Sequence, residues 1–205
     1  MSAMFIQVDP ALLDDPEELE RLFFPDFAFA GGHSAQFRAE LERGVQQMAQ
    51  SHPELREALE EQLAKMYSGN GSAKSTDGVY GKLDLEKTWH GLHYLLSGTV
   101  DEPGETTIGK AVLGGTEIGE DFSGYGAARY FAPADVGEVA AALASSGDDE
   151  VMARFDPQRM AGLQIYPFGW DEPDDREWLL ESLRELRSFY GDAAANGRAI
   201  VTCLV

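Results

Sequence analysis

The sequence has a single cysteine, no long apolar run and few basic residues, and each shortage excludes a class of protein. One cysteine cannot form an internal disulfide, and Cys203 lies in an apolar run where we expect a buried structural thiol rather than a nucleophile. No run of about 18 apolar residues is present, so we expect no membrane span. The first ten residues lack the basic and apolar regions of a signal peptide, so we expect a cytoplasmic protein.

Basic residues are scarce, because 16 Lys and Arg stand against 36 Asp and Glu, which gives a formal net charge of -20. A charge of this sign repels phosphate backbones and anionic lipids, so nucleic-acid and membrane-surface roles are disfavoured. The acids cluster in residues 9–20 and 171–177. These clusters either keep the protein soluble or form an acidic face that matches a basic protein partner.

The composition otherwise suits a globular protein, since 43% of its 205 residues are hydrophobic and can bury a core. Strand and helix patterns do not alternate regularly, which favours an α+β class over a doubly wound sheet. We predict a single helix-rich domain over residues 1–205, with a small sheet that includes the N-terminal and C-terminal strands. Residues 67–82 are expected to form a flexible loop, because they are rich in glycine and serine.

Periodicity places the elements of this domain. Apolar runs predict strands, and apolar residues at spacings of three and four predict helices. The expected strands and extended segments are residues 4–8, 162–167 and 198–205. The expected helices are a hairpin over residues 34–66, a central helix over 83–98, a helix that Pro133 opens, and a long helix over 174–195.

The central helix carries the first candidate site. Residues on a helix advance by about 100°, so Glu86, His90 and His93 are predicted to share one flank beside an apolar face. Carboxylate and imidazole groups are ligands that suit zinc. However, the spacing is not that of His-Glu-x-x-His, and three ligands on one helix rarely converge on one ion. We therefore expect no metal and no cofactor, with His93 hydrogen-bonded at the core edge and Glu86 paired with His90.

The glycine-rich loop over residues 114–126 carries the second candidate site. Glu117, Glu120 and Asp121 stand among its glycines, and neighbouring carboxylates suit general acid–base chemistry. Alternatively, the glycines supply turns, and Glu120 or Asp121 pairs with Arg129 to hold the loop against the next strand. We favour this pairing. The glycine spacing excludes both a dinucleotide-binding loop and a serine nucleophile elbow.

Three segments together resemble a known family. These are Lys-Thr-Trp-His-x-x-His at residues 87–93, Val-Leu-Gly-Gly at 112–115 and Gly-Tyr-Gly-Ala-Ala-Arg-Tyr at 124–130. They are similar to signature segments of the bacterial YfbM-like family, and the similarity spans nearly the whole chain except residues 67–82. The resemblance implies a small α+β domain of unknown function, without established catalytic residues. The residues that it marks are Trp89, His90, His93, Gly114, Gly115, Gly119, Tyr125, Arg129 and Tyr130.

Two functional hypotheses follow from these patterns. We favour a non-enzymatic acidic protein that binds a basic protein partner. The alternative is a small-ligand site or a hydrolase-type enzyme that uses a histidine, carboxylate and arginine pocket. It requires the histidine helix and the glycine loop to meet. The candidate pocket comprises Glu86, Trp89, His90, His93, Glu120, Asp121, Tyr125, Arg129 and Tyr130.

Overall fold

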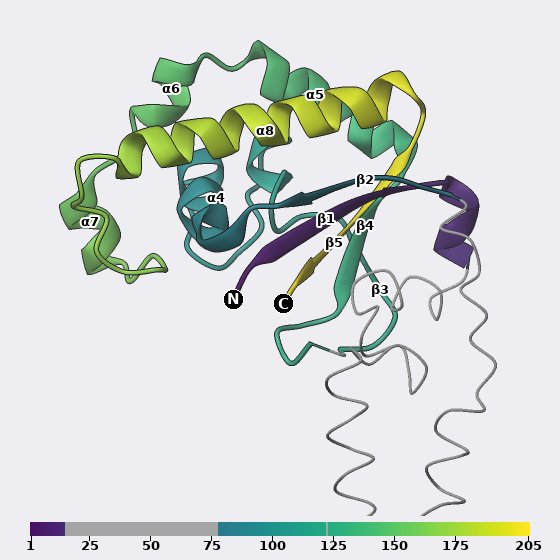
Figure 1. Ribbon diagram of the computed structural model, residues 1–205, viewed down its shortest axis with the longest axis horizontal. Helices are drawn as coiled ribbons and strands as arrows, with labels where there is room; N and C mark the ends of the chain where they lie inside the picture. The colour runs from purple at the N-terminus through teal and green to yellow at the C-terminus, as the bar shows by residue number, and fades with distance from the viewer. Residues whose placement is uncertain (15–77, 122) are drawn as a thin grey trace, which may run out of the picture. The chain divides into compact units, whose positions relative to one another are not determined.

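The computed structural model describes residues 1–14, 78–121 and 123–205 (Figure 1). The chain divides into one compact unit of Met1–Pro16 with Gly78–Val205 and another of residues 17–77. The helical hairpin predicted over residues 34–66 therefore lies outside the described residues. A single domain over the whole chain stays a prediction.

A five-stranded antiparallel sheet runs through the described unit (Figure 1). Its strands are β1 (Ala3–Val8), β2 (Val79–Asp84), β3 (Thr116–Ile118), β4 (Ala128–Phe131) and β5 (Ala199–Leu204), in the spatial order β2-β1-β5-β4-β3. Strands β1 and β5 are neighbours, and Ala3 pairs with Leu204. The predicted α+β class, with the first and last strands in one sheet, is confirmed.

Strand β2 begins within the segment that we expected to be a loop. Residues 79–82 pair with β1, and Gly81 lies opposite Gln7 in the register. Tyr80 and Lys82 are exposed whereas Gly81 is half-buried, which is the alternation of a strand with one inner face. The glycines and small polar residues before β2 hide this short alternation in the sequence.

The helices of the described unit are η1 (Pro10–Asp14), η3 (Glu86–Thr88), α4 (Trp89–Ser97), η4 (Ile108–Lys110), α5 (Pro133–Ser145), α6 (Asp148–Met152), α7 (Pro157–Gly162) and α8 (Asp175–Ala195). Helices α5 and α8 contact the sheet, and α4 and α6 pack against α8. Helix α8 runs along the sheet with α5 beside it (Figure 1). Tyr190 of α8 is buried edge-on against Phe131, with ring centroids 5.8 Å apart, and its hydroxyl donates to the Ala111 carbonyl at 2.9 Å. None of the described helices is both long and apolar enough to cross a membrane.

The helix expected over residues 83–98 starts later than predicted. Residues 83 and 84 complete β2, η3 follows, and α4 begins only at Trp89. Glu86 has a φ of +46° and donates its N–H to Asp84 Oδ1 at 2.7 Å. This turn interrupts the helical periodicity, so Glu86 is exposed and the predicted pair with His90 does not form.

Residues 162–167 form a compact loop rather than the predicted extended segment. Gly162 ends α7, and the fully buried Ile165 donates its N–H to the Met160 carbonyl at 3.0 Å. The Ile165 carbonyl accepts the indole N–H of Trp170, also at 3.0 Å. These local bonds satisfy the backbone in place of a strand ladder.

Candidate functional site

His90 and His93 are buried on α4 and bind backbone groups of two loops. His90 Nδ1 accepts the Tyr166 N–H at 3.0 Å, so the ring carries its proton on Nε2, which donates to the Val100 carbonyl at 3.0 Å. His93 Nε2 donates to the Glu102 carbonyl at 3.1 Å. The hydrogen bond expected for His93 is present, but its side chain is fully buried rather than at the core edge. The two rings hold the segment after α4 in place.

Burial keeps both histidines neutral. Loss of hydration lowers the pKa of His93 to about 4, although the bond to Glu102 opposes the shift. Burial also lowers the pKa of His90, against the bond to Val100 and the carboxylate of Asp101, whose Oδ1 lies 3.9 Å from Nε2. Both ring nitrogens of His90 are occupied by backbone groups. His90 therefore has no nitrogen left to bind a ligand.

The pKa of His93 predicts how stability changes with pH. The unfolded chain takes up a proton near the usual value of 6.5 and the folded chain near 4, so stability is lost as the pH falls through this window. Between pH 7 and pH 5 this residue alone should lower the free energy of unfolding by about 2 kcal/mol. Urea unfolding of the wild type and His93→Gln at both pH values measures it. An equal pH-dependent loss in the two proteins would contradict the assignment to His93.

The three possible metal ligands that the sequence places on one helix flank are not brought together. Glu86 is exposed on η3, whereas His90 and His93 are buried on α4. Within residues 1–14, 78–121 and 123–205, no three His, Cys, Asp or Glu side chains are placed to hold a metal ion.

Arg129 pairs with Glu117 rather than with Glu120 or Asp121. The two residues are opposite each other in the β3–β4 register, and Arg129 Nη2 lies 2.6 Å from Glu117 Oε1. Arg129 Nη1 also donates to the Gly115 carbonyl at 3.1 Å. The prediction was wrong because residues 116–118 form a strand, which makes Glu117 the direct cross-strand neighbour. Asp121 instead accepts the Gly124 N–H at 2.8 Å, and Glu120 is exposed.

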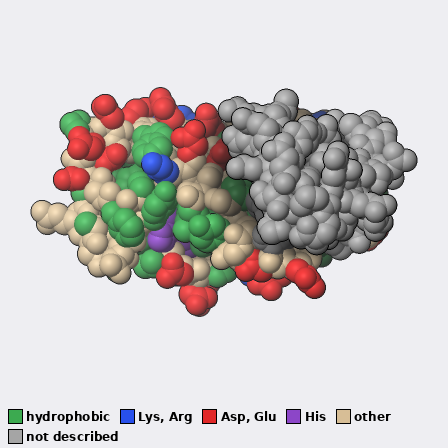
Figure 2. All heavy atoms as spheres, turned by 60° about the horizontal axis from the view of Figure 1, so that its bottom comes forward, with side chains coloured by type: hydrophobic (Ala, Val, Ile, Leu, Met, Phe, Trp, Pro, Cys, Tyr) green, Lys and Arg blue, Asp and Glu red, His purple; other side chains and the backbone are tan. Residues whose placement is uncertain are grey.

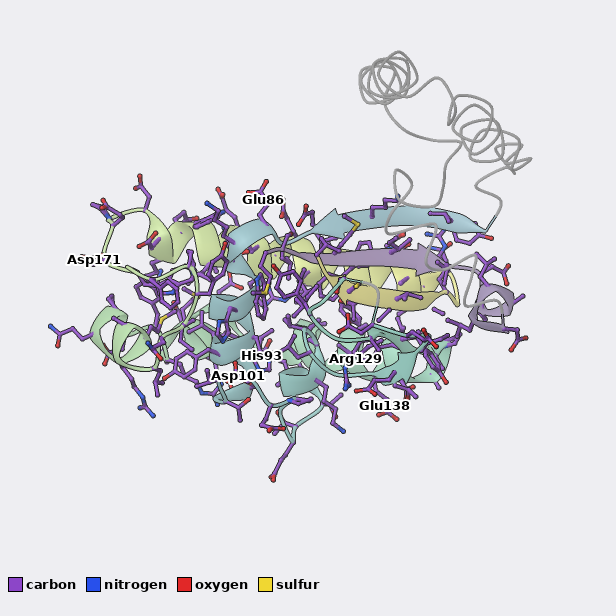
Figure 3. All side chains as sticks on the ribbon, turned by 90° about the horizontal axis from the view of Figure 1, so that it is seen from below. Glu86, His93, Asp101, Arg129, Glu138 and Asp171 are labelled. Carbon is purple, nitrogen blue, oxygen red and sulfur yellow. The ribbon has the colours of Figure 1, made fainter. Side chains whose placement is uncertain are left out.

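Arg129 and Tyr125 line a cavity of about 230 Å³, which we call the Arg129 cavity. Asp101, Glu117 and Cys203 also line it. Neither histidine reaches this cavity, but His90 lies against Asp101, which is part of its wall. Figure 3 labels Asp101 beside His93 and Arg129 on the same side of the unit. The segment after α4, which carries Asp101, and the glycine loop therefore line the same cavity.

Cys203 is buried beneath the glycine loop. Its side chain is 3% exposed, and burial raises the pKa of its thiol to about 11. A hydrogen bond with Ser123 lowers this pKa, and the charge of Asp121 raises it further. A protonated, buried thiol is a poor nucleophile, as expected for a structural residue.

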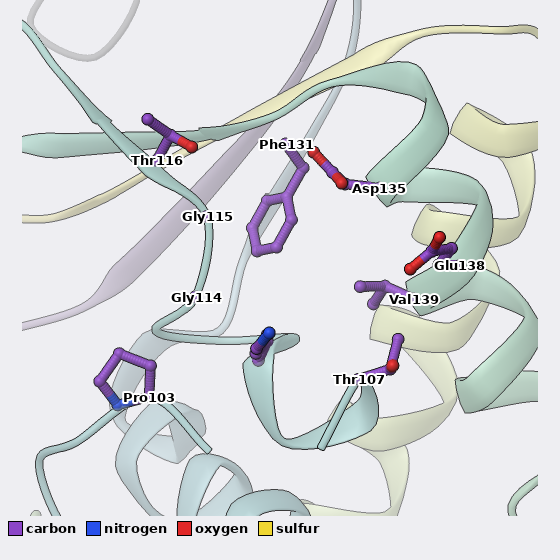
Figure 4. A pocket seen from close by; sticks show the side chains of 10 residues that line it. Pro103, Thr107, Gly114, Gly115, Thr116, Phe131, Asp135, Glu138 and Val139 are labelled. Atoms are coloured by element: carbon purple, nitrogen blue, oxygen red, sulfur yellow. The ribbon is translucent and has the colours of Figure 1, made fainter. Parts of the chain in front are cut away.

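A second cavity, of about 280 Å³, lies between the Gly114–Gly115 turn and α5 (Figure 4). Asp135 and Glu138 of α5 lie across from the turn, and Lys110 also lines the cavity. Thr116 lines this second cavity and Glu117, the next residue of β3, lines the Arg129 cavity, because successive residues of a strand point to opposite faces. The short β3 strand therefore separates two small hollows.

Of the remaining candidate residues, Trp89 is buried and Tyr130 is half-buried on β4. The Trp89 ring stacks on His90, with centroids 4.8 Å apart. Sequence reasoning missed Asp101, which stands in an ordinary loop, and it assigned Glu117 no ion pair. The alternation in Thr116-Glu117-Ile118 was the one signal for a strand that pairs Glu117 with Arg129.

The described residues thus define an α+β domain with a mixed-charge cavity beside a buried histidine helix. A family model described as a domain of unknown function (DUF1877) matches residues 32–203, and the chain belongs to this family. The chain is also similar to the crystal structure of a protein of unknown function, YfbM from Escherichia coli. The two chains are 18% identical, with a TM-score of 0.57 over 100% of each. This likeness shows the fold, and together the two matches confirm the predicted YfbM-like family. No curated protein matches.

Proposed function

We propose that the protein is a non-enzymatic binding protein that recognises a basic segment of a protein partner at the Arg129 cavity. The charge balance of the cavity carries this proposal. Among the described residues that line it, Arg129 is the only cation, and Glu117 already neutralises it. Among the described residues, the carboxylate of Asp101 lies near the imidazoles of His90 and His93 rather than near a lysine or arginine, and its side chain is 87% exposed. The cavity therefore keeps a net negative charge that a cationic side chain would complement.

The size and walls of the cavity also suit one basic side chain. About 230 Å³ is below the usual range of roughly 300–1,000 Å³ for pockets that enclose whole ligands. Tyr125 is 52% exposed at its edge and offers a ring face for a cation–π contact. The second cavity has the same formal balance of two carboxylates and one cation, but the aromatic residue that lines it, Phe131, is buried and offers no exposed ring face.

The alternative of a hydrolase-type enzyme has weaker support. It needs a histidine or a nucleophile that reaches the cavity. The described lining residues include neither histidine, and the Cys203 thiol is held protonated. The histidines are better explained as positioning residues for the wall that carries Asp101.

A pair of small probes that differ in charge tests this proposal. We expect N-acetyl-arginine methylamide to shift the amide NMR signals of Asp101, Glu117 and Tyr125, because the cavity complements a guanidinium. N-acetyl-citrulline methylamide has nearly the same shape without the charge, and it should leave them unmoved. Asp101→Asn should weaken binding of the arginine probe several-fold, since one charge contact near a surface contributes up to about 1 kcal/mol. Equal shifts with both probes, or no shift with either, would overturn the proposal.

A further inference from the structure

We propose that three apolar side chains of the α7–α8 loop, two of them exposed and one half-buried, bind an apolar side chain of the same partner segment. The three are Leu163, Tyr166 and Phe168, which we call the Phe168 patch. The inference rests on the proposed function, because a basic residue of that segment would enter the Arg129 cavity. The partner is accordingly a protein segment with a large apolar residue close to a lysine or arginine.

Phe168 is held outside the core by its backbone. Its side chain is 63% exposed, the highest value among the large hydrophobic residues that the structure describes. Its φ is +72°, in the left-handed region that a non-glycine residue adopts only at an energetic cost. Leu163, which is 37% exposed, is a second large apolar residue exposed in the same loop. An exposed aromatic ring in an unfavourable backbone conformation is typical of a recognition site rather than of a stabilising contact.

The patch is also preorganised for binding. The Phe168 N–H donates to the Ile165 carbonyl at 3.2 Å, and the Tyr166 N–H donates to His90 Nδ1. The Tyr166 ring meets the Phe168 ring edge-on, with centroids 6.1 Å apart. A rigid aromatic group loses little conformational entropy on binding, which is why such residues dominate interface energetics.

One imidazole ring links the patch to the Arg129 cavity. His90 binds the backbone of Tyr166 through Nδ1, and Asp101 of the cavity wall lies 3.9 Å from its Nε2. In Figure 2, histidine atoms lie among apolar side chains, a basic side chain also lies in this area, and carboxylates border it above and below. The patch and the cavity therefore lie on either side of a single buried residue, so one partner segment can contact both.

The charge around the patch selects a basic occupant. Asp171 and Glu172 follow Phe168 closely in the chain, and both are exposed. Arg176 at the start of α8 pairs with Asp149 rather than with either of these carboxylates. With a net charge of -20, a second copy of this chain would be repelled, and so would an anionic membrane. Charge complementarity thus favours a basic partner over self-association.

Selection from a random peptide library displayed on phage, with the full-length protein as bait, tests the inference. We expect the selected peptides to combine an aromatic or leucine residue with lysine or arginine. For a selected peptide made synthetically, Phe168→Gly should weaken binding at least about tenfold, as truncation of a central aromatic anchor does. Glycine tolerates the positive φ, so this variant keeps the loop conformation. Tyr80→Ser, which removes another exposed aromatic residue from β2, is the matched control and should bind like the wild type.

The variants separate this inference from the proposed function. Loss of binding in Asp101→Asn but not in Phe168→Gly would overturn the role of the Phe168 patch and leave the role of the Arg129 cavity supported. Loss in Phe168→Gly alone would support the patch and count against the cavity. No enrichment, or enrichment of acidic peptides, would overturn both. A wild-type dimer by light scattering that Phe168→Gly converts to a monomer would show that a second copy covers the patch, which would overturn the proposed occupant.

Discussion

Replacement of Trp170 by alanine should lower the free energy of unfolding by about 3–5 kcal/mol, the usual cost of removing a large aromatic side chain from a core. Trp170 is 1% exposed, and its indole N–H binds the Ile165 carbonyl at the base of the Phe168 patch. Urea unfolding of Trp170→Ala measures the loss. A loss below about 1 kcal/mol would contradict the packing that we describe.

Gly91 of α4 provides a second test of the same contact. A Cβ atom at Gly91 would lie 2.7 Å from Cζ2 of Trp170, so Gly91→Ala should destabilise the wild type by about 1–3 kcal/mol through overpacking. The same change in the Trp170→Ala background should cost clearly less, because the two closest contacts are removed and the contact with Leu179 Cδ2 at 2.9 Å remains. Gly137→Ala in α5 is the matched control. A Cβ there meets nothing within 4 Å, and it should stabilise the helix by about 0.5–1 kcal/mol.

Gly115→Ala should have the other large effect, a loss of about 2–5 kcal/mol in the free energy of unfolding. Gly115 has a φ of +90°, which costs an alanine roughly 1–2 kcal/mol. A Cβ would also lie 2.7 Å from the backbone oxygen of Tyr130, which cannot move without displacing β4, and this overlap adds about 1–3 kcal/mol. Because Arg129 donates a hydrogen bond to the Gly115 carbonyl, the substitution should also disturb the Arg129 cavity.

Gly126→Ala separates backbone strain from steric overlap. Gly126 has a φ of +106°, but a Cβ there meets nothing within 4 Å. In this control, the free energy of unfolding should therefore fall only by the cost of the left-handed backbone conformation, about 1–2 kcal/mol. Chemical denaturation of both variants gives the difference. If Gly115→Ala loses no more stability than Gly126→Ala, the result would contradict the close contact between the Gly114–Gly115 turn and the backbone of β4.

Elements with a long, regular apolar pattern were predictable from the sequence. The helix expected over residues 174–195 is α8, and its apolar positions Leu179, Leu183, Leu186 and Tyr190 are all buried. The terminal strands were predicted for a similar reason, since both are almost continuously buried in the middle of the sheet. When a whole helix face or strand is buried, each of its inward positions is apolar. This pattern can be read from the sequence without knowledge of the tertiary structure.

Features that depend on a partner distant in sequence were not predictable. The segment before Trp89 reads as helix by spacing, but Leu85 donates its N–H to the Ala3 carbonyl, and this tertiary bond keeps residues 85–88 out of α4. The choice of Glu117 by Arg129 likewise depends on the register of β3 with β4. Asp101 belongs to the candidate site because it lies next to His90 in the folded protein, and the sequence of its loop has no distinctive motif.

The pairing of Ala3 with Leu204 also determines how the chain reaches its native state. These residues are about two hundred positions apart, so their contact closes nearly the whole chain into one loop, at an entropic cost of roughly 5 kcal/mol. Contacts of such high sequence separation slow folding. The β3–β4 hairpin and the packing of α5 on α8 involve much shorter separations and can form first. We infer that the docking of β1 onto β5 is a late step, and that the two inner strands have exposed edges until it occurs.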